Sequence, residues 1–104
     1  MKIYIAGPMT GMPELNFPAF LAAARALRSM GMEVINPAEL NPDPSTPWIE
    51  CMRRDIAALM TCDQIYLMQG WEKSKGATLE HHIASQLNFG LVIEGKLEFQ
   101  NELN

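Results

Sequence analysis

The sequence predicts an α/β protein in which helices cover both faces of a parallel sheet. Short apolar, β-rich runs occur at 2–6, 33–36, 64–68 and 89–93. Segments with helical periodicity separate these runs, and strands that alternate with helices form right-handed βαβ crossovers. The run at 64–68 is nearly all apolar, which is typical of a buried parallel strand. We therefore expect a three-layer sandwich with a four- or five-stranded parallel sheet, forming a single domain over residues 1–104.

The first half of the chain alternates a strand, a helix and a strand. After the strand at 2–6, clustered Gly and Pro residues at 7–13 forbid regular structure. Asn16 is expected to cap the helix that follows and ends at Gly31. Beyond the second strand, the proline-rich segment 37–47 is predicted to be too irregular to form an element of its own.

The second half repeats this alternation. We expect a helix at 48–60, the strand at 64–68, a helix at 76–87 and the last strand at 89–93, with the polar tail from Glu94 unassigned. In open sheets of this kind, ligands bind beyond the carboxyl ends of the strands. The loops that begin at Gly7, Asn36 and Gln69 are therefore predicted to converge on a binding site.

Composition excludes several classes of partner and ligand. The chain has 104 residues, of which 48% are hydrophobic, so one compact core is expected. A net charge of −4 leaves no basic surface for a nucleic acid polymer. Because no apolar run reaches membrane-spanning length and no signal peptide is recognisable, we expect a soluble, cytoplasmic protein without membrane contact. Cys51 and Cys62 are predicted to be reduced thiols, and no metal or organic cofactor is indicated.

Two acidic residues fall on the apolar faces of their predicted helices. On a wheel of 100° per residue, Glu80 lies within the stripe formed by Ala77, Ile83, Ala84 and Leu87. Asp55 lies on the side of its helix that carries Trp48, Cys51 and Leu59. Burying an ionised carboxylate is costly, and acids with perturbed pKa values concentrate at functional sites. The alternative is that each acid is a border residue or accepts backbone hydrogen bonds.

A possible anion site precedes the third long helix. Ser74, Lys75, Gly76 and Thr78 stand where a helix presents unpaired amides and the positive end of its dipole. This arrangement fits a phosphate group, and the alternative is ordinary capping of the helix by Ser74. Asp63 is predicted to have a turn or capping role at the opposite end of the sheet.

Three motifs occur together in the order found in one enzyme family. They are the opening Ile3-Tyr4-Ile5-Ala6-Gly7-Pro8, the helix of Asp55 with Asp63 downstream, and Ser74-x-Gly76-x-x-x-Glu80. Over residues 2 to about 93 the chain resembles the superfamily of nucleoside 2-deoxyribosyltransferases and 2′-deoxynucleoside 5′-monophosphate N-glycosidases. Asn36-Pro37-Ala38-Glu39-Leu40 and Trp71-Glu72-Lys73 resemble a small phage and bacterial branch. The resemblance implies a Rossmann-like (flavodoxin-like) fold.

The resemblance also implies roles for individual residues. Glu80 would attack the anomeric carbon of a deoxyribose, Tyr4 would orient it, and Asp55 would contact or protonate the departing base. Transferases of the superfamily usually carry an aspartate where this chain has Ser74, and a serine beside helix amides suits a phosphate. The resemblance therefore favours hydrolysis of a nucleotide, with deoxyribosyl transfer as a side reaction.

Further expectations concern the substrate and the assembly. The substrate, a small-molecule nucleotide or nucleoside, is expected to contact Gly7, Pro8, Met9, Thr10, Gly11, Ser74 and Gly76. By analogy with the family, the protein is expected to be a homodimer. Two other functions stay open at this point: a non-catalytic protein that binds or sequesters nucleotides, and a glycosidase that acts on NAD or ADP-ribose-type nucleotides.

Overall fold

A four-stranded parallel sheet forms the centre of the fold. The computed structural model describes residues 1–95, so the predicted tail lies outside the described residues except for Glu94 and Gly95. The strands are β1 (Lys2–Ala6), β2 (Glu33–Ile35), β3 (Gln64–Leu67) and β4 (Gly90–Ile93), in the order β2-β1-β3-β4. All three strand pairs are parallel. This confirms the predicted fold class, with four strands in the described part of the chain.

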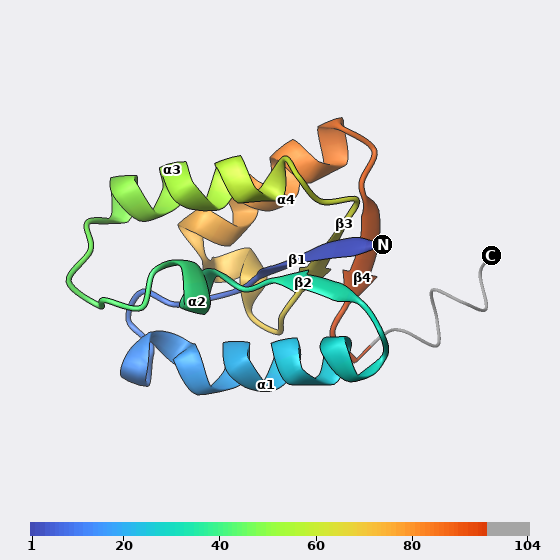
Figure 1. Cartoon of the computed structure of the whole chain (residues 1–104). Coiled ribbons are helices and arrows are strands. Elements are labelled where there is room, and N and C mark those ends of the chain that lie inside the picture. The colour runs from blue at the N-terminus through green and yellow to red at the C-terminus, as the bar shows by residue number, and fades with distance from the viewer. Residues whose placement is uncertain (96–104) are drawn as a thin grey trace.

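Helices cover both faces of this sheet (Figure 1). Helix α1 (Phe17–Ser29) lies on one face, and α3 (Trp48–Leu59) and α4 (Lys75–Gln86) lie on the other. The strand order explains this distribution, because right-handed crossovers place helices on opposite faces when the chain changes direction along the sheet. That change occurs at β1, which pairs with β2 on one side and β3 on the other. In such sheets the point of reversal opens a crevice for ligands.

The side chains of β1 alternate between two apolar cores. Ile3 and Ile5 pack with Phe20 and Leu27 under α1. Tyr4 and Ala6 face the other way and pack with residues of α3, β3 and α4. Each of these four β1 side chains is at most 1% exposed. The side chain of Tyr4 therefore lies in the interior, on the same side of the sheet as the helices that carry the two predicted acids.

Two local predictions are wrong. Asn16 precedes α1, but its backbone is left-handed (φ 61°) and its side chain makes no capping bond. Its Nδ2 instead donates to the carbonyl of Pro8 at 3.0 Å, because Glu14 and Leu15 are also left-handed and turn the chain before the helix begins. The segment 37–47 is not wholly irregular, since α2 (Pro37–Leu40) forms one helical turn. Asn36 caps this turn by accepting a bond from the Ala38 amide at 3.0 Å.

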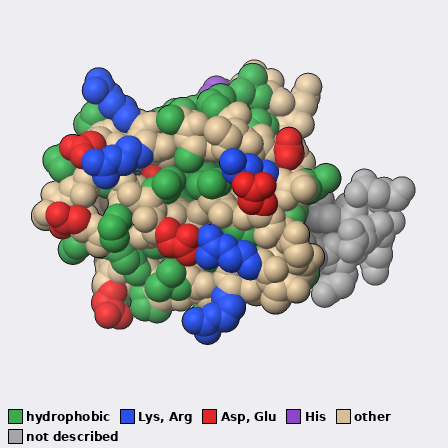
Figure 2. Space-filling model, in the orientation of Figure 1, with side chains coloured by type: hydrophobic (Ala, Val, Ile, Leu, Met, Phe, Trp, Pro, Cys, Tyr) green, Lys and Arg blue, Asp and Glu red, His purple; other side chains and the backbone are tan. Residues whose placement is uncertain are grey.

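Other expectations concern the surface and the cysteines. Among residues 1–95, no helix is long and apolar enough to cross a membrane. Both cysteines are free thiols, with Cys62 buried and Cys51 half-buried. On the face shown in Figure 2, acidic and basic side chains are interspersed rather than separated by sign.

Candidate active site

A cavity of about 180 Å³ opens at the carboxyl ends of the strands. The loops after β1, β2 and β3 contribute to its wall, as the topology predicts, together with residues of α3 and α4 and with Phe20 of α1. Its lining residues are Gly7, Met9, Thr10, Leu15, Phe20, Pro37, Pro44, Thr46, Trp48, Cys51, Met52, Asp55, Ser74, Gly76, Ala77 and Glu80. Both predicted acids therefore reach one cavity from different helices.

Glu80 is the more deeply perturbed of the two acids. It lies on the inner face of α4 and is 4% exposed. Its Oε2 accepts a 2.7 Å hydrogen bond from the hydroxyl of Tyr4, which comes from β1, 76 residues earlier in the chain. Burial raises the pKa of Glu80 to about 8, the Tyr4 bond opposes this rise, and the charge of Asp55 adds to it. At neutral pH, Glu80 therefore retains its proton in most molecules.

Asp55 lies on the inner face of α3 and is 6% exposed. Its Oδ1 accepts a 2.8 Å hydrogen bond from the Nδ2 of Asn41. Burial raises the pKa of Asp55 to about 6, against the lowering effect of this bond and of the Arg54 charge. At neutral pH, Asp55 is therefore mostly ionised.

The two acids and Tyr4 form a cluster that can move protons and carry charge. Burial and the neighbouring carboxylates raise the pKa of Tyr4 well above its usual value, so its hydroxyl stays protonated and serves as a donor. Where two carboxyl groups with different pKa values share one catalytic centre, one commonly acts as the acid and the other as the nucleophile. Such a pair suits cleavage of a bond at a sugar carbon, where positive charge develops and a leaving group needs a proton.

The loop after β1 is placed only in part as predicted. Gly7, Met9 and Thr10 line the cavity, and Pro8 lines an adjoining one. Gly11 lines neither of them, is exposed, and has a left-handed backbone (φ 83°) that a turn requires. At Gly7 a Cβ would lie 2.8 Å from both the Cβ and the Sδ of Met68, so glycine permits close packing there.

Ser74 caps α4, in agreement with one of the two interpretations of this residue. Its Oγ accepts a 3.1 Å bond from the Ala77 amide. Ser74 and Gly76 nevertheless line both the main cavity and the adjoining one. A Cβ at Gly76 would come within 3.1 Å of the Met52 Sδ, so this glycine also allows α4 to approach α3 closely.

The adjoining cavity, of about 480 Å³, lies beside the start of α4. Lys73 and Lys75 line it together with Trp48, and the Lys75 ammonium stands 4.3 Å from the centre of the Trp48 ring. This contact is a cation–π interaction. The two cavities share Thr10, Trp48, Ser74 and Gly76 in their walls.

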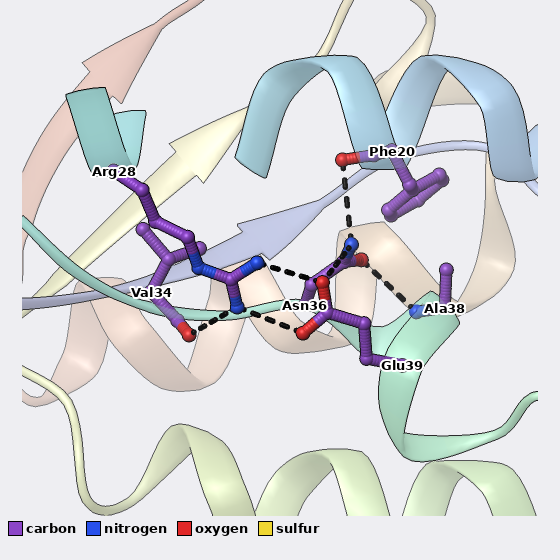
Figure 3. Close-up of polar contacts among 6 residues, drawn as sticks. All are labelled: Phe20, Arg28, Val34, Asn36, Ala38 and Glu39. Carbon is purple, nitrogen blue, oxygen red and sulfur yellow. Dashed lines mark hydrogen bonds and ion pairs between the residues drawn. The ribbon is translucent and has the colours of Figure 1, made fainter. Parts of the chain in front are cut away.

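Two buried asparagines support the site and were not predicted. Asn41 reaches Asp55, as described above, and is 6% exposed. Asn36 is 1% exposed and joins three segments: its Nδ2 donates to the Phe20 carbonyl and to Glu39, and its Oδ1 accepts from Ala38 (Figure 3). Glu39 in turn holds Arg28 through two hydrogen bonds. The Asn-Pro pairs at 36–37 and 41–42 are a turn signal from which the capping of α2 could have been predicted.

Other polar residues lie away from the cavity. His82 is exposed, and the ring of His81 packs against that of Trp71 in a tilted arrangement, with ring centres 4.5 Å apart. Asp63 accepts a 3.1 Å bond from the Lys2 amide at the amino end of the sheet, opposite the site, as predicted. Within the described residues, no three His, Cys, Asp or Glu side chains come together as a metal site.

Comparisons with known proteins agree with the fold. A solved structure of a 2-deoxyribosyltransferase from the psychrotolerant bacterium Bacillus psychrosaccharolyticus is similar to this chain, with a TM-score of 0.69 and 20% identity. The match covers 89% of this chain and 71% of that chain. No curated protein matches. The resemblance to deoxyribosyltransferases is thus confirmed at the level of the fold. A family model described as a domain of unknown function, DUF4406, matches residues 1–93, and the chain belongs to that family.

Proposed function

We propose that this protein is an N-glycosidase that hydrolyses the bond between base and sugar in a 2′-deoxynucleoside 5′-monophosphate. The observation that carries the proposal is the pair of buried carboxyl groups, Glu80 and Asp55, in the wall of one cavity. The cavity stands at the carboxyl ends of the strands in a fold that a 2-deoxyribosyltransferase shares.

The reaction would proceed in two steps. In the first, an oxygen of ionised Glu80 bonds to C1′ of the sugar as the C1′–N bond breaks, and the base leaves with the bonding electrons and the proton of Asp55. In the second, water attacks C1′, Asp55 takes a proton from it, and the bond to Glu80 breaks to release deoxyribose 5-phosphate. A free base in place of water would give deoxyribosyl transfer.

At the pKa values of the resting site, only a minority of molecules are in the protonation state that the reaction needs. The reaction needs Glu80 ionised and Asp55 protonated, whereas a pKa of about 8 for Glu80 and about 6 for Asp55 favours the reverse. At pH 7 each group is in its reactive form in roughly 9% of molecules, so both coincide in roughly 1%. Activity should therefore be flat between about pH 6 and 8 and fall on either side. Positive charge developing on the sugar would favour ionised Glu80.

Ser74 supports the choice of a monophosphate. Because its Oγ accepts from the Ala77 amide, the hydroxyl hydrogen remains available to donate to a phosphate oxygen. The amides of the first turn of α4 and the positive end of its dipole lie beside it. Ser74→Asp would place a negative charge at this point and should weaken binding of a monophosphate more than binding of the nucleoside. Equal effects on both ligands would contradict a phosphate position at Ser74.

The adjoining cavity favours a second candidate substrate class. Lys73 and Lys75 line it, and it shares four wall residues with the main cavity. A nucleotide with a longer phosphate chain, such as NAD or an ADP-ribose derivative, could extend into this space. Glu80 would then bond to C1′ of its ribose as the bond between C1′ and the base breaks, and the base would leave with the bonding electrons.

The deciding experiment compares wild type with Glu80→Gln on a panel of deoxynucleoside monophosphates, ribonucleoside monophosphates and NAD. Free base is followed by chromatography. We expect release from a deoxynucleoside monophosphate by wild type and none by the variant. Release from NAD alone would establish the second candidate, and binding without release would identify a nucleotide-binding protein. Peptide mapping of a trapped sugar adduct should find it on Glu80; an adduct on Asp55 would reverse the two roles.

A further inference from the structure

Asn41 is buried where α2 gives way to the proline-rich loop, and each of its polar atoms has a partner. Its Nδ2 donates to Asp55 Oδ1 at 2.8 Å and to the Pro37 carbonyl at 3.3 Å. Its Oδ1 accepts a 3.2 Å bond from the guanidinium of Arg54. Arg54 is held in turn by Glu50, one helical turn earlier on α3. A chain of polar contacts thus runs from the surface to the candidate acid.

The partners of Asn41 determine which way its amide points. A guanidinium only donates hydrogen bonds, so it requires the carbonyl oxygen of Asn41. The Pro37 carbonyl only accepts, so it requires the amide nitrogen. A flipped amide would place donor against donor at Arg54 and acceptor against acceptor at Pro37. The amide nitrogen therefore faces Asp55.

We propose that Asn41 is a positioning residue that fixes the acidic proton of Asp55 on Oδ2 and holds that carboxyl group in its working orientation. The proposal rests on the proposed glycosidase function, in which Asp55 protonates the leaving base. An N–H donor at Oδ1 is satisfied by a carbonyl-type oxygen, so the proton of the neutral acid resides on the other oxygen. With Oδ1 held, the carboxyl group cannot rotate freely, and Oδ2 is the atom left to deliver the proton.

The surroundings of Asp55 define what removal of Asn41 should do. Arg54 from its own helix and Tyr4 from β1 lower the pKa of Asp55, and the charge of Asp55 in turn raises the pKa values of Glu80 on α4 and Cys51 on α3. The Asn41 hydrogen bond lowers the pKa of Asp55 against the effect of burial. Without this bond, the effect of burial would be less opposed and the pKa of Asp55 would rise further.

The first test is a titration of the resting protein that needs no substrate. The Asp55 carboxyl carbon is followed by NMR in wild type, in Asn41→Leu, and in Asn41→Asp, which keeps the side-chain shape and an acceptor for Arg54. We expect the midpoint to rise by about one pH unit in Asn41→Leu, the usual effect of one lost hydrogen bond to a charged group, and further in Asn41→Asp. An unchanged midpoint in both variants would overturn the proposal, whatever the activity.

The second test separates positioning from general damage to the site. Base release from a natural nucleotide needs proton donation, whereas 4-nitrophenolate leaves a deoxyriboside 5-phosphate without it. Asn41→Leu should slow kcat for the nucleotide at least about tenfold and change kcat for the nitrophenyl substrate little, because only the first depends on general-acid catalysis. Equal losses on both substrates would reduce Asn41 to a structural residue and overturn the proposal.

Matched variants of α3 complete the design. Arg54→Met removes both the donor that orients the Asn41 amide and a charge that itself lowers the pKa of Asp55, while Arg53→Met changes an exposed neighbour on the same helix. We expect Arg54→Met to raise the Asp55 midpoint and Arg53→Met to leave it unchanged. Wild-type protein that releases no base from any substrate would defeat the proposed function, and the titration would still decide whether Asn41 controls Asp55.

Discussion

Replacing Glu80 with glutamine should stabilise the fold and remove a large part of its pH dependence. Glu80 is 4% exposed, and burial raises its pKa from 4.5 in the unfolded chain to about 8 in the folded protein. Between these values the folded state binds a proton that the unfolded state has released. Stability must therefore fall as the pH rises through this window, by about 1.4 kcal/mol per pH unit.

The magnitude follows from the two pKa values. The Glu80 carboxyl group destabilises the folded protein by about 1 kcal/mol at pH 5, about 3 kcal/mol at pH 7 and about 5 kcal/mol at pH 9. Near pH 4 and below, both states are mostly protonated and the contribution is small. Glutamine is close in shape to the neutral acid and its amide oxygen can accept the Tyr4 hydrogen bond, so the variant should lack this pH-dependent loss.

The assay is urea denaturation of wild type and Glu80→Gln at several pH values from 5 to 9. The difference in unfolding free energy should grow with pH in favour of the variant, while any pH-independent offset reflects the amide itself. Glu72→Gln, which changes an exposed glutamate near the start of the same helix, is the matched control and should follow wild type. Parallel profiles for wild type and Glu80→Gln would contradict a raised pKa for Glu80, because they would mean that the folded and unfolded states hold the Glu80 proton equally well.

Three further predictions test other parts of the structure. Tyr4→Phe removes the hydroxyl that donates to Glu80 and should therefore raise the pKa of Glu80. Base release at pH 7 should fall by about tenfold to a hundredfold, and the alkaline limb of the pH profile should move to higher pH. An unchanged profile would contradict the role of Tyr4. Gly7→Ala places a Cβ 2.8 Å from Met68 and should lower the free energy of unfolding by about 1 to 3 kcal/mol in denaturant titrations. A variant as stable as wild type would show that Met68 can move aside at no cost. Asn36→Ala deletes the cap of α2 and the bond to the Phe20 carbonyl (Figure 3) and should lower the free energy of unfolding by about 1 to 3 kcal/mol. Arg28→Gln breaks an exposed ion pair and should lower it by less than about 1 kcal/mol. A larger loss for Arg28→Gln in thermal unfolding would contradict this ranking.

Local patterns were sufficient for most of the fold. Strand and helix periodicity predicted the alternation of elements and hence the parallel sheet, because each pattern records which face of its own element is buried. The same periodicity placed Glu80 and Asp55 on inner faces, and both are buried. The failures are short-range: Asn16 does not cap α1, because a left-handed turn directs its side chain to Pro8, and the single turn of α2 is too brief to produce a periodic signal.

The wall of the cavity could be predicted only in outline. The rule for parallel sheets indicated which loops converge, and Gly7 and Ser74 do line the cavity. Gly11 does not, because the chain has already turned away from the strand ends by that point. Trp48 was predicted only to be an apolar helix position and Met52 was not singled out, yet both line the cavity from α3.

The fold class and the two acids on apolar helix faces could be predicted without the structure, since both depend on spacing along a single element. The hydrogen-bond partners of these acids could not be predicted in this way. Tyr4 meets Glu80 across 76 positions of sequence, and Asn41 meets Asp55 across 14. These contacts join different elements, so they depend on how strands and helices pack and cross. Side-chain periodicity carries no information about that packing, and the pKa values of the two acids follow from it.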